Sequence, residues 1–263
     1  MRRLLAPEAE PDPSPGDEPA AEELERLAAA YAYPAREAGP YLRANMVGSL
    51  DGAAQYEGRS APLSSPADMR VFGVLRALAD VVVVGAETAR AEGYRPARAR
   101  AAFAGRRAAD GQAPAPAIAV VSRSLDLALD APLFTDPVVP TLLLTGAAAP
   151  AGRRAAAERA GARVLIAGDG EGVDPARAVR ELAALGHARL LHEGGPRLLA
   201  QFAAAGVLDE LCLTLAPFVA GGDAQRIMNG LPVPGPARFR LVSVLEEDGF
   251  LFTRYVRRPA TAG

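Results

Sequence analysis

The sequence predicts an α/β fold with a mainly parallel central sheet flanked by helices and a C-terminal antiparallel hairpin. From Tyr41 onward, apolar runs of strand length alternate with helical patterns, which is typical of βαβ units. Runs such as VVVVG and TLLLTG are apolar without interruption, as expected of strands that helices cover on both faces. Half of the residues are hydrophobic but only 5% are aromatic, so Ala, Val and Leu must form most of the core.

The N-terminal region differs in composition from the rest of the chain. Residues 6–20 are rich in Pro, Glu and Ala and too polar to pack, which predicts a flexible extension, and a short helix is expected at 22–31. We assign both to residues 1–38. We assign one domain to residues 39–258, because α/β chains of this length commonly form a single core.

The alternating region predicts the following elements in chain order. Strands are expected at 41–47, 80–85, 117–122, 141–146, 163–168 and 189–195, with helices at 66–79, 153–161, 175–186 and 196–206. After Gly206 the pattern changes to strands, and the turn EEDG separates the last two, RLVSVL and GFLFTRYV. Residues 95–116 are rich in Ala, Arg, Gly and Pro without periodicity, which predicts a long mobile loop.

The helix that begins at Pro66 has the clearest start signal. Ser65 can cap it, Pro66 suits the first helical position, and Asp68 completes a Ser-x-x-Asp box. The spacing of its apolar residues predicts a buried stripe of Met69, Phe72, Leu75 and Leu78.

Composition and charge exclude several classes of function. The formal net charge of −2 provides no basic field for nucleic acid or anionic lipid. No apolar stretch reaches the ~18 residues of a membrane span, and no secretory leader is recognisable, so we expect a cytoplasmic protein. The single Cys212 lies in an apolar run and is expected to be a buried strand residue, and we expect no metal site.

Ligands of a parallel sheet bind at the carboxyl ends of its strands, where helix N-termini favour phosphate. At VVVVGAET, Gly85 allows a tight exit and Thr88 offers a hydroxyl; a plain capped turn is the alternative. At RLLHEGGP, Gly194 and Gly195 allow close approach of a backbone before a helix that begins at Pro196, and a purely structural turn is again the alternative.

Three further residues are candidates on chemical grounds. Ser122 and Arg123 leave a strand tip where a hydroxyl and a guanidinium could hold a 2′-phosphate, which favours NADPH over NADH; a solvated arginine is the alternative. Glu193 would repel phosphate but could accept hydrogen bonds from a neutral ring or ribose, so we assign it to substrate.

Over residues 40–257 the chain resembles the reductase of riboflavin biosynthesis. The resemblance lies in the order and spacing of SLDG, SSP with its helix, VVVVGAET, and HEGGP followed by DEL. The resemblance implies a dihydrofolate-reductase-like fold and a homodimer. It also implies NADPH-dependent reduction of 5-amino-6-(5-phosphoribosylamino)uracil, with hydride transfer to the ribose C1 of the open imine form.

The resemblance also implies roles for individual positions. Cofactor contacts are implied at Gly48, Gly85, Thr88, Glu92, Ser122, Arg123, Gly194, Gly195 and Pro196. Substrate contacts are implied at Asn45, Ser60, Arg76 and Glu193. Asn45 stands where fused bacterial enzymes carry lysine, and in this the chain is similar to stand-alone archaeal and fungal reductases.

The chain departs from the family pattern in two places. It carries neither the H-x-E nor the P-C-x-x-C signature of the zinc deaminase that precedes many bacterial relatives, so we expect deamination to occur elsewhere. Where relatives have Asp-Asp-Pro and a phosphate-binding arginine, this chain reads Glu92, Gly93, Tyr94, Arg95, Pro96, which leaves the ribose phosphate without an assigned contact.

For catalysis the sequence offers two acidic candidates. We expect Asp51, in the turn SLDG, to organise the substrate site and its proton relay, and Glu193 to anchor the heterocycle; a bare turn is the alternative for Asp51. His187 and His192 are expected to be structural. Alternative functions are an NADPH reductase of another pteridine-like or pyrimidine-like substrate, including weak dihydrofolate reduction, and a non-catalytic nucleotide-binding dimer.

Overall fold

The computed structural model describes residues 1–5, 20–230 and 235–258, and the chain divides into two compact units. Unit 1 comprises Met1–Tyr31, Arg43–Val74 and Pro196–Gly263. Unit 2 comprises Ala32–Leu42 and Leu75–Gly195. The extension predicted at 6–20 lies outside the described residues up to position 19.

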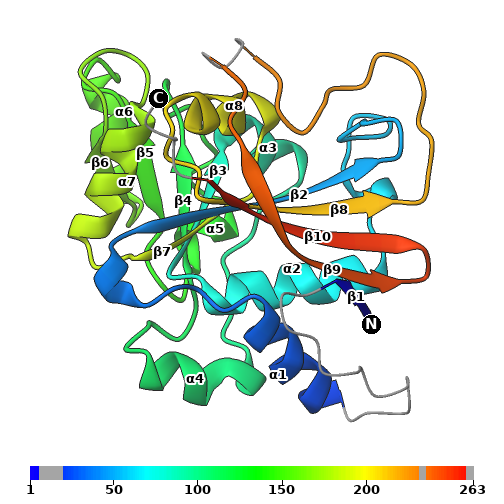
Figure 1. Cartoon of the computed structure of the whole chain (residues 1–263). Helices are drawn as coiled ribbons and strands as arrows, with labels where there is room; N and C mark the ends of the chain where they lie inside the picture. The colour runs from blue at the N-terminus through cyan, green and yellow to red at the C-terminus, as the bar shows by residue number, and fades with distance from the viewer. Residues whose placement is uncertain (6–19, 231–234, 259–263) are drawn as a thin grey trace. The chain divides into compact units, whose positions relative to one another are not determined.

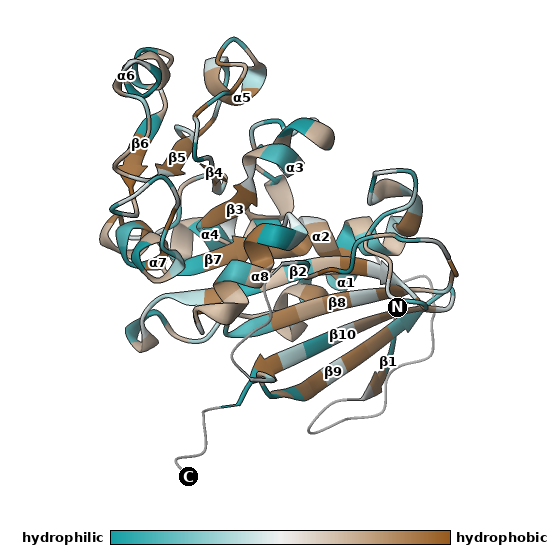
Figure 2. Cartoon of the chain, turned by 90° about the horizontal axis from the view of Figure 1, so that it is seen from above, coloured by the Kyte–Doolittle hydropathy of each residue, from teal (hydrophilic) through white to brown (hydrophobic). Residues whose placement is uncertain are grey.

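Unit 2 contains a parallel sheet that confirms the predicted βαβ pattern. Its strands lie in the order β7 (Arg189–His192), β3 (Val81–Gly85), β4 (Ala117–Val121), β5 (Leu142–Thr145) and β6 (Arg163–Ile166), and each adjacent pair is parallel. Every residue of β5 and the first four of β3 and β4 are buried. The apolar runs are therefore central strands, and β3 and β5 are brown in Figure 2.

Helices alternate with these strands along the chain of unit 2. They are α3 (Ala86–Ala91), α4 (Ala104–Ala109), α5 (Pro132–Thr135), α6 (Ala151–Arg159) and α7 (Pro175–Ala184), with short 3-10 helices η1 (Arg36–Ala38) and η3 (Ala101–Phe103). The start of α7 shows the local chemistry: Pro175 occupies the first turn and the Asp174 side chain accepts a hydrogen bond from the backbone N–H of Arg177.

The mobile loop predicted at 95–116 is wrong, because this segment contains η3 and α4. Phe103 is 1% exposed and Arg107 only 2% exposed. The Arg107 guanidinium donates to the carbonyl oxygens of Ala77, Ala79 and Ala113 at 2.7–2.8 Å. An arginine that satisfies backbone carbonyls anchors the segment, and apolar periodicity cannot reveal such an anchor.

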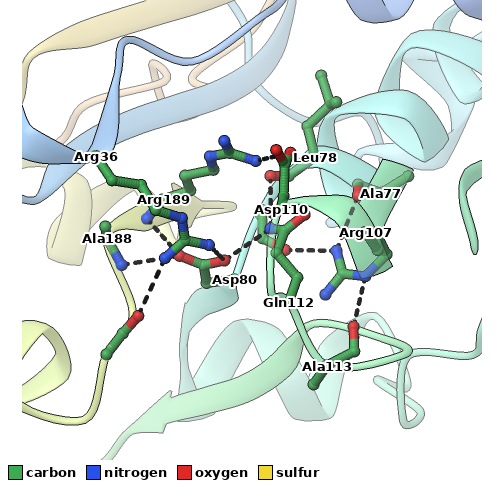
Figure 3. A network of polar contacts seen from close by, with 12 residues as sticks. Arg36, Ala77, Leu78, Asp80, Arg107, Asp110, Gln112, Ala113, Ala188 and Arg189 are labelled. Atoms are coloured by element: carbon green, nitrogen blue, oxygen red, sulfur yellow. Dashed lines mark hydrogen bonds and ion pairs between the residues drawn. The ribbon is translucent and has the colours of Figure 1, made fainter. Parts of the chain in front are cut away.

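Asp80, directly before β3, connects several segments at the amino ends of the parallel strands (Figure 3). Its carboxylate accepts hydrogen bonds at 2.7–2.8 Å from Arg36, Gln112 and the backbone N–H groups of Ala188 and Arg189. Its backbone N–H donates to the carbonyl of Arg189 at 2.8 Å. Asp80 therefore fixes the start of β7 beside the start of β3.

The sheet of unit 1 is mainly antiparallel. Its strands lie in the order β1 (Arg2–Leu5), β9 (Phe239–Glu247), β10 (Phe250–Arg257), β8 (Glu210–Ala216) and β2 (Tyr41–Ser49), and only β8 and β2 pair in parallel. Figure 1 shows β8, β10, β9 and β1 side by side. The predicted hairpin is confirmed: Asp248 and Gly249 join β9 to β10 with φ values of 53° and 80°, as a type I′ turn requires.

The three helices predicted for unit 1 are present, with two wrong details in α2. They are α1 (Ala20–Ala30), α2 (Pro66–Leu78), whose last turn belongs to unit 2, and α8 (Pro196–Ala204). The 3-10 helix η2 (Ala61–Leu63) was not predicted. Ser65 caps α2 by accepting from the backbone N–H of Asp68 at 3.1 Å. The Asp68 carboxylate instead accepts from Ser64 and Thr214 at 2.6 and 2.7 Å. Met69, expected in the buried stripe, is 55% exposed.

A buried ionic cluster lies between three strands of unit 1. Glu210 accepts hydrogen bonds from Arg43 on β2 at 2.6 Å and from Arg254 on β10 at 2.8 and 2.9 Å. Burial raises the pKa of Glu210, but the charges and hydrogen bonds of the two arginines outweigh burial and lower the pKa to about 2. Cys212 is a buried strand residue, as expected.

Two searches of the described residues gave negative results. None of the helices in residues 1–5, 20–230 and 235–258 is long and apolar enough to cross a membrane. Within the same ranges, His, Cys, Asp and Glu side chains form no group of three that could hold a metal ion.

Candidate active site

The carboxyl ends of β3 and β7 lie side by side in unit 2. The N–H of Glu193 donates to the carbonyl of Val83 at 2.9 Å, and the N–H of Gly85 donates to the carbonyl of Gly194 at 3.0 Å. The two strand ends that the sequence marked as candidate cofactor sites are therefore adjacent.

Gly195 lies directly against the side chain of Thr88. A Cβ atom built at Gly195 would stand 2.5 Å from Thr88 Oγ1, which is too close for any other residue without a shift. The peptide bond between Gly194 and Gly195 is cis, and Pro196 begins α8 immediately after it. This turn presents backbone without side chains beside a hydroxyl, an arrangement suited to a phosphate-containing cofactor.

His192 supports the same turn from inside the sheet. Its side chain is fully buried, and Nδ1 accepts a hydrogen bond from the N–H of Gly194 at 3.0 Å. Burial lowers the pKa of His192 to about 3, so the ring is neutral at physiological pH. The predicted structural role of His192 agrees with this position.

The next strand, β4, is followed directly by the predicted Ser122 and Arg123. The N–H of Ser122 donates to the carbonyl of Leu144, and the Ser122 hydroxyl accepts from the N–H of Leu125 at 3.0 Å. The Arg123 side chain is 73% exposed, and its Nη1 lies 3.8 Å from Oε2 of Glu171, whose side chain is 74% exposed. Such a surface pair is weak, so the guanidinium is accessible to an anion.

A second polar cluster of unit 2 is centred on Glu193. Arg76 donates from Nε to Oε1 at 2.7 Å and from Nη2 to Oε2 at 2.6 Å, and the Tyr94 hydroxyl donates to Oε2 at 2.6 Å. The Arg76 Cζ also lies 5.2 Å from the centre of the Tyr94 ring, within range of a cation–π contact. We call Arg76, Glu193 and Tyr94 the guanidinium triad.

The surroundings of Arg76 and Tyr94 shift the pKa values of both side chains upward. Burial lowers the pKa of Arg76, but the charge and hydrogen bonds of Glu193 outweigh it and raise the pKa above its ordinary value. Burial and the charge of Glu193 raise the pKa of Tyr94 well above its ordinary value. Arg76 is therefore a cation and Tyr94 a neutral donor at physiological pH.

The backbone explains how Tyr94 reaches Glu193. At the end of α3 the N–H of Tyr94 donates to the carbonyl of Ala89, and the N–H of Gly93 donates to the carbonyl of Arg90. This pair of bonds is a Schellman motif, and it places Gly93 in the left-handed region with a φ of 63°. The motif reverses the chain, so Tyr94 turns back toward the strand ends.

Four other predicted residues lie in unit 1, whereas the predicted Glu92 directly follows α3 in unit 2. Asn45 and Gly48 are on β2, Ser60 precedes η2, and Asp51 lies in the turn after β2. The Asp51 carboxylate accepts hydrogen bonds from the Ser49 hydroxyl and from the backbone N–H groups of Ala220 and Gly221. These hydrogen bonds, that of Ser49 first, lower the pKa of Asp51 to about 2.

The structure thus brings together, within unit 2, the predicted Gly85, Thr88, Gly194 and Gly195, with Ser122 and Arg123 at the neighbouring strand end. Arg76 and Glu193, predicted separately as substrate contacts, form one ion pair. Sequence reasoning missed Tyr94 as a partner of Glu193, 99 residues away in the chain. The only local signal was the glycine that ends α3.

Comparison with known proteins is consistent with this arrangement. The sequence profile described as RibD C-terminal domain matches residues 40–249. The chain belongs to the RibD C-terminal domain family. This result confirms the resemblance drawn from the motifs.

Two curated relatives of this RibD-type chain are archaeal enzymes, both named 2,5-diamino-6-ribosylamino-4(3H)-pyrimidinone 5′-phosphate reductase. The protein from Archaeoglobus fulgidus is 28% identical over 83% of this chain and 99% of the relative. That from Methanothermobacter thermautotrophicus is 31% identical over 73% of this chain and 84% of the relative.

A similar solved structure is a pyrimidine reductase-like protein from Corynebacterium diphtheriae. It has a TM-score of 0.78 and 26% sequence identity, covering 89% of this chain and 98% of that chain. The α/β fold described above is therefore that of a known group of pyrimidine reductase-like proteins.

Proposed function

We propose that this chain is an NADPH-dependent reductase of a 6-ribosylaminopyrimidine 5′-phosphate in riboflavin biosynthesis. The observation that carries the proposal is that a glycine turn and the guanidinium triad meet where β3 and β7 end, in a chain of a reductase family. The names of the two archaeal relatives support the substrate class.

The residues present fit a dinucleotide. Gly194 and Gly195 expose backbone beside the Thr88 hydroxyl, and no side chain other than hydrogen fits at Gly195. Arg123 is exposed at the next strand end, where it would pair with the 2′-phosphate that distinguishes NADPH from NADH. The other proposed cofactor contacts in unit 2 are Gly85, Glu92 and Ser122, and family resemblance adds Gly48 and Pro196, which belong to unit 1. When bound, NADPH supplies the hydride.

The substrate differs in one detail from the sequence-based expectation. The resemblance implied the deaminated uracil compound, whereas the archaeal relatives are named for the 2,5-diamino compound, which carries an amino group instead of an oxygen at C2. We place the diamino compound first and the uracil compound second. Asn45, Ser60, Arg76 and Glu193 remain the proposed substrate contacts.

The reaction requires the ribosylamine in its open imine form. The ribose C1 accepts a hydride and the attached nitrogen accepts a proton, which gives the ribitylamino product. Arg76, held by Glu193, orients the substrate so that C1 faces the hydride donor. Asp51, ionised at physiological pH, acts by ordering the backbone at 49–53 and 220–221. Its pKa of about 2 makes it a poor proton donor.

The testing experiment measures NADPH consumption by the purified chain with the diamino compound, the uracil compound, dihydrofolate and no added substrate. We expect saturable turnover with the phosphorylated ribosylaminopyrimidines and little with dihydrofolate. Turnover on dihydrofolate alone would favour a pteridine-like substrate. NADPH binding without turnover on any compound would favour a non-catalytic role.

Three further parts of the proposal follow from family resemblance. We propose that the reductase domain spans residues 39–258, that the chain forms a homodimer and that it works in the cytoplasm. Light scattering at several protein concentrations tests the homodimer.

A further inference from the structure

Tyr94 lies in the segment Glu92–Pro96, which departs from the family pattern, and Tyr94 itself has no assigned role. It contacts both charged members of the guanidinium triad: its hydroxyl donates to Glu193 Oε2 at 2.6 Å, and its ring lies 5.2 Å from Arg76 Cζ. One side chain thus touches the ion pair with both its polar and its aromatic part.

Exposure separates the two charged members of the guanidinium triad. The Glu193 side chain is 2% exposed, whereas the Arg76 side chain is 23% exposed. Both oxygens of Glu193 already accept hydrogen bonds from Arg76 or Tyr94. Of the two charged groups, the guanidinium is therefore the one that can meet a ligand, while Tyr94 is half-buried beside it with its hydroxyl directed at Glu193.

The charge of the triad indicates what the guanidinium recognises. Arg76 and Glu193 cancel each other, and Tyr94 adds a neutral hydroxyl, so the triad has no net charge to attract a phosphate dianion. A planar guanidinium fixed by a bidentate carboxylate is suited to directed hydrogen bonds with a flat, uncharged acceptor. In a 6-ribosylaminopyrimidine phosphate, that acceptor is the pyrimidine ring.

We propose that Tyr94 is a positioning residue for substrate recognition, which holds Glu193 and Arg76 so that the guanidinium binds the pyrimidine ring and not the ribose phosphate. This inference rests on the proposed function. It assigns the divergent segment to the substrate site, where the Schellman motif at Gly93 delivers Tyr94.

The test compares wild-type enzyme, Tyr94→Phe and Tyr94→Leu with the diamino compound, both phosphorylated and dephosphorylated. Tyr33→Phe is the matched control, because the Tyr33 hydroxyl donates to the backbone carbonyl of Leu190. Tyr94→Phe removes only the hydroxyl, and Tyr94→Leu removes the ring as well.

We expect Tyr94→Phe to raise KM for the pyrimidine about tenfold, because hydrogen bonds to charged groups in a binding site contribute strongly to recognition. The factor should be the same for both forms of the substrate, KM for NADPH should be unchanged, and Tyr94→Leu should have the larger effect. Tyr33→Phe should leave every KM unchanged. The thermal midpoint of each variant shows that the changes do not arise from unfolding.

Two results would overturn the inference while leaving the proposed function intact. An unchanged KM for the pyrimidine in Tyr94→Phe would remove Tyr94 from the site. An increase confined to the phosphorylated substrate would assign the triad to the phosphate. A wild-type chain that neither reduces nor binds the pyrimidine, measured by titration calorimetry, would overturn the proposed function and the inference with it.

Discussion

Two glutamates of this chain each bind arginine through paired hydrogen bonds, and their surroundings differ. Glu210 and Arg43 in unit 1 are both 0% exposed, and Arg254, which supplies the paired hydrogen bonds to Glu210, is 15% exposed. Glu193 in unit 2 is nearly as buried as Glu210, but its partner Arg76 is 23% exposed. The ion pair of Glu210 with Arg43 is therefore closed, whereas that of Glu193 with Arg76 is accessible at the guanidinium.

The difference separates structural from recognition chemistry. A fully enclosed ion pair can only satisfy its own members, so its contribution is to the folded state. An ion pair with one accessible guanidinium keeps its geometry and can still bind a ligand. The comparison therefore predicts that changes at Glu210 act on stability and changes at Glu193 act on turnover.

The largest expected effect is that of Glu210→Gln on stability. Replacing this carboxylate leaves Arg43 buried without its counter-charge, which costs about 3–5 kcal/mol in comparable cases. Urea denaturation measures the loss. Glu181→Gln is the control, since Glu181 is 39% exposed and 3.7 Å from Arg177, and it should cost less than about 0.5 kcal/mol. Equal losses in the two variants would contradict the structural role of the enclosed cluster.

The enclosed cluster also predicts acid sensitivity. The folded pKa of Glu210 is about 2, below its ordinary value of 4.5, so its stabilisation is fully present above about pH 4.5 and is lost as pH falls toward 2. The free energy of unfolding of wild type should therefore approach that of Glu210→Gln over this range. If the free energies of unfolding of the two proteins instead changed in parallel with pH, Glu210 would not titrate in this way.

The next effect is that of Glu193→Gln on turnover. Loss of the carboxylate removes the paired, charge-assisted hydrogen bonds that orient Arg76. We therefore expect kcat/KM for the pyrimidine to fall about a hundredfold, as for other preorganised polar groups. Stability should change much less than in Glu210→Gln, because Arg76 can reach water. Steady-state kinetics measures kcat/KM and urea denaturation measures the free energy of unfolding on the same sample. A wild-type kcat/KM in Glu193→Gln would place substrate recognition elsewhere.

A smaller effect is expected at the glycine turn. Gly195→Ala places a Cβ 2.5 Å from Thr88 Oγ1, and we expect the Kd for NADPH to rise about tenfold, a binding difference of 1.4 kcal/mol. The matched control is Gly152→Ala in α6, where a Cβ meets nothing within 4 Å. It should stabilise the helix by up to about 1 kcal/mol without affecting NADPH. Fluorescence titration with NADPH measures both, and equal affinities would exclude the turn from the cofactor site.

The smallest expected effect is on the pH profile of Asp51→Asn. The pKa of Asp51 is about 2, so the carboxylate carries its charge throughout the neutral range in wild type. The variant should lose activity through the disturbed turn, yet its pH profile of kcat/KM should keep the wild-type shape. Disappearance of an ionisation near neutrality would instead identify Asp51 as the proton relay.

The sequence predicted the strands of unit 2 well because a doubly covered strand is apolar along its whole length. The glycines and Thr88 could be placed for the same reason, since parallel strands deliver their carboxyl ends to one edge. The sequence marked Glu193 as a candidate but could not reveal that Glu193 and Glu210 both pair with arginine, because these partners lie far away in the chain.

Three errors or omissions have a common cause. The burial of Arg107 depends on carbonyl acceptors, and the position of Tyr94 depends on a chain reversal. Strand β1 depends on pairing with residues 244–246. None of these produces a local periodicity. The prediction for Met69 is wrong in the opposite sense, because its helical spacing indicated burial although its side chain is exposed.

The Asp80 network has a consequence for how such a chain can change. It ties the starts of two strands and the segments of Arg36 and Gln112 to one carboxylate (Figure 3). The sheet is therefore fixed at the edge opposite the strand ends where we propose that ligands bind. Segments such as Glu92–Pro96 can then vary in evolution, or be redesigned for another heterocycle, without loosening the sheet that carries them.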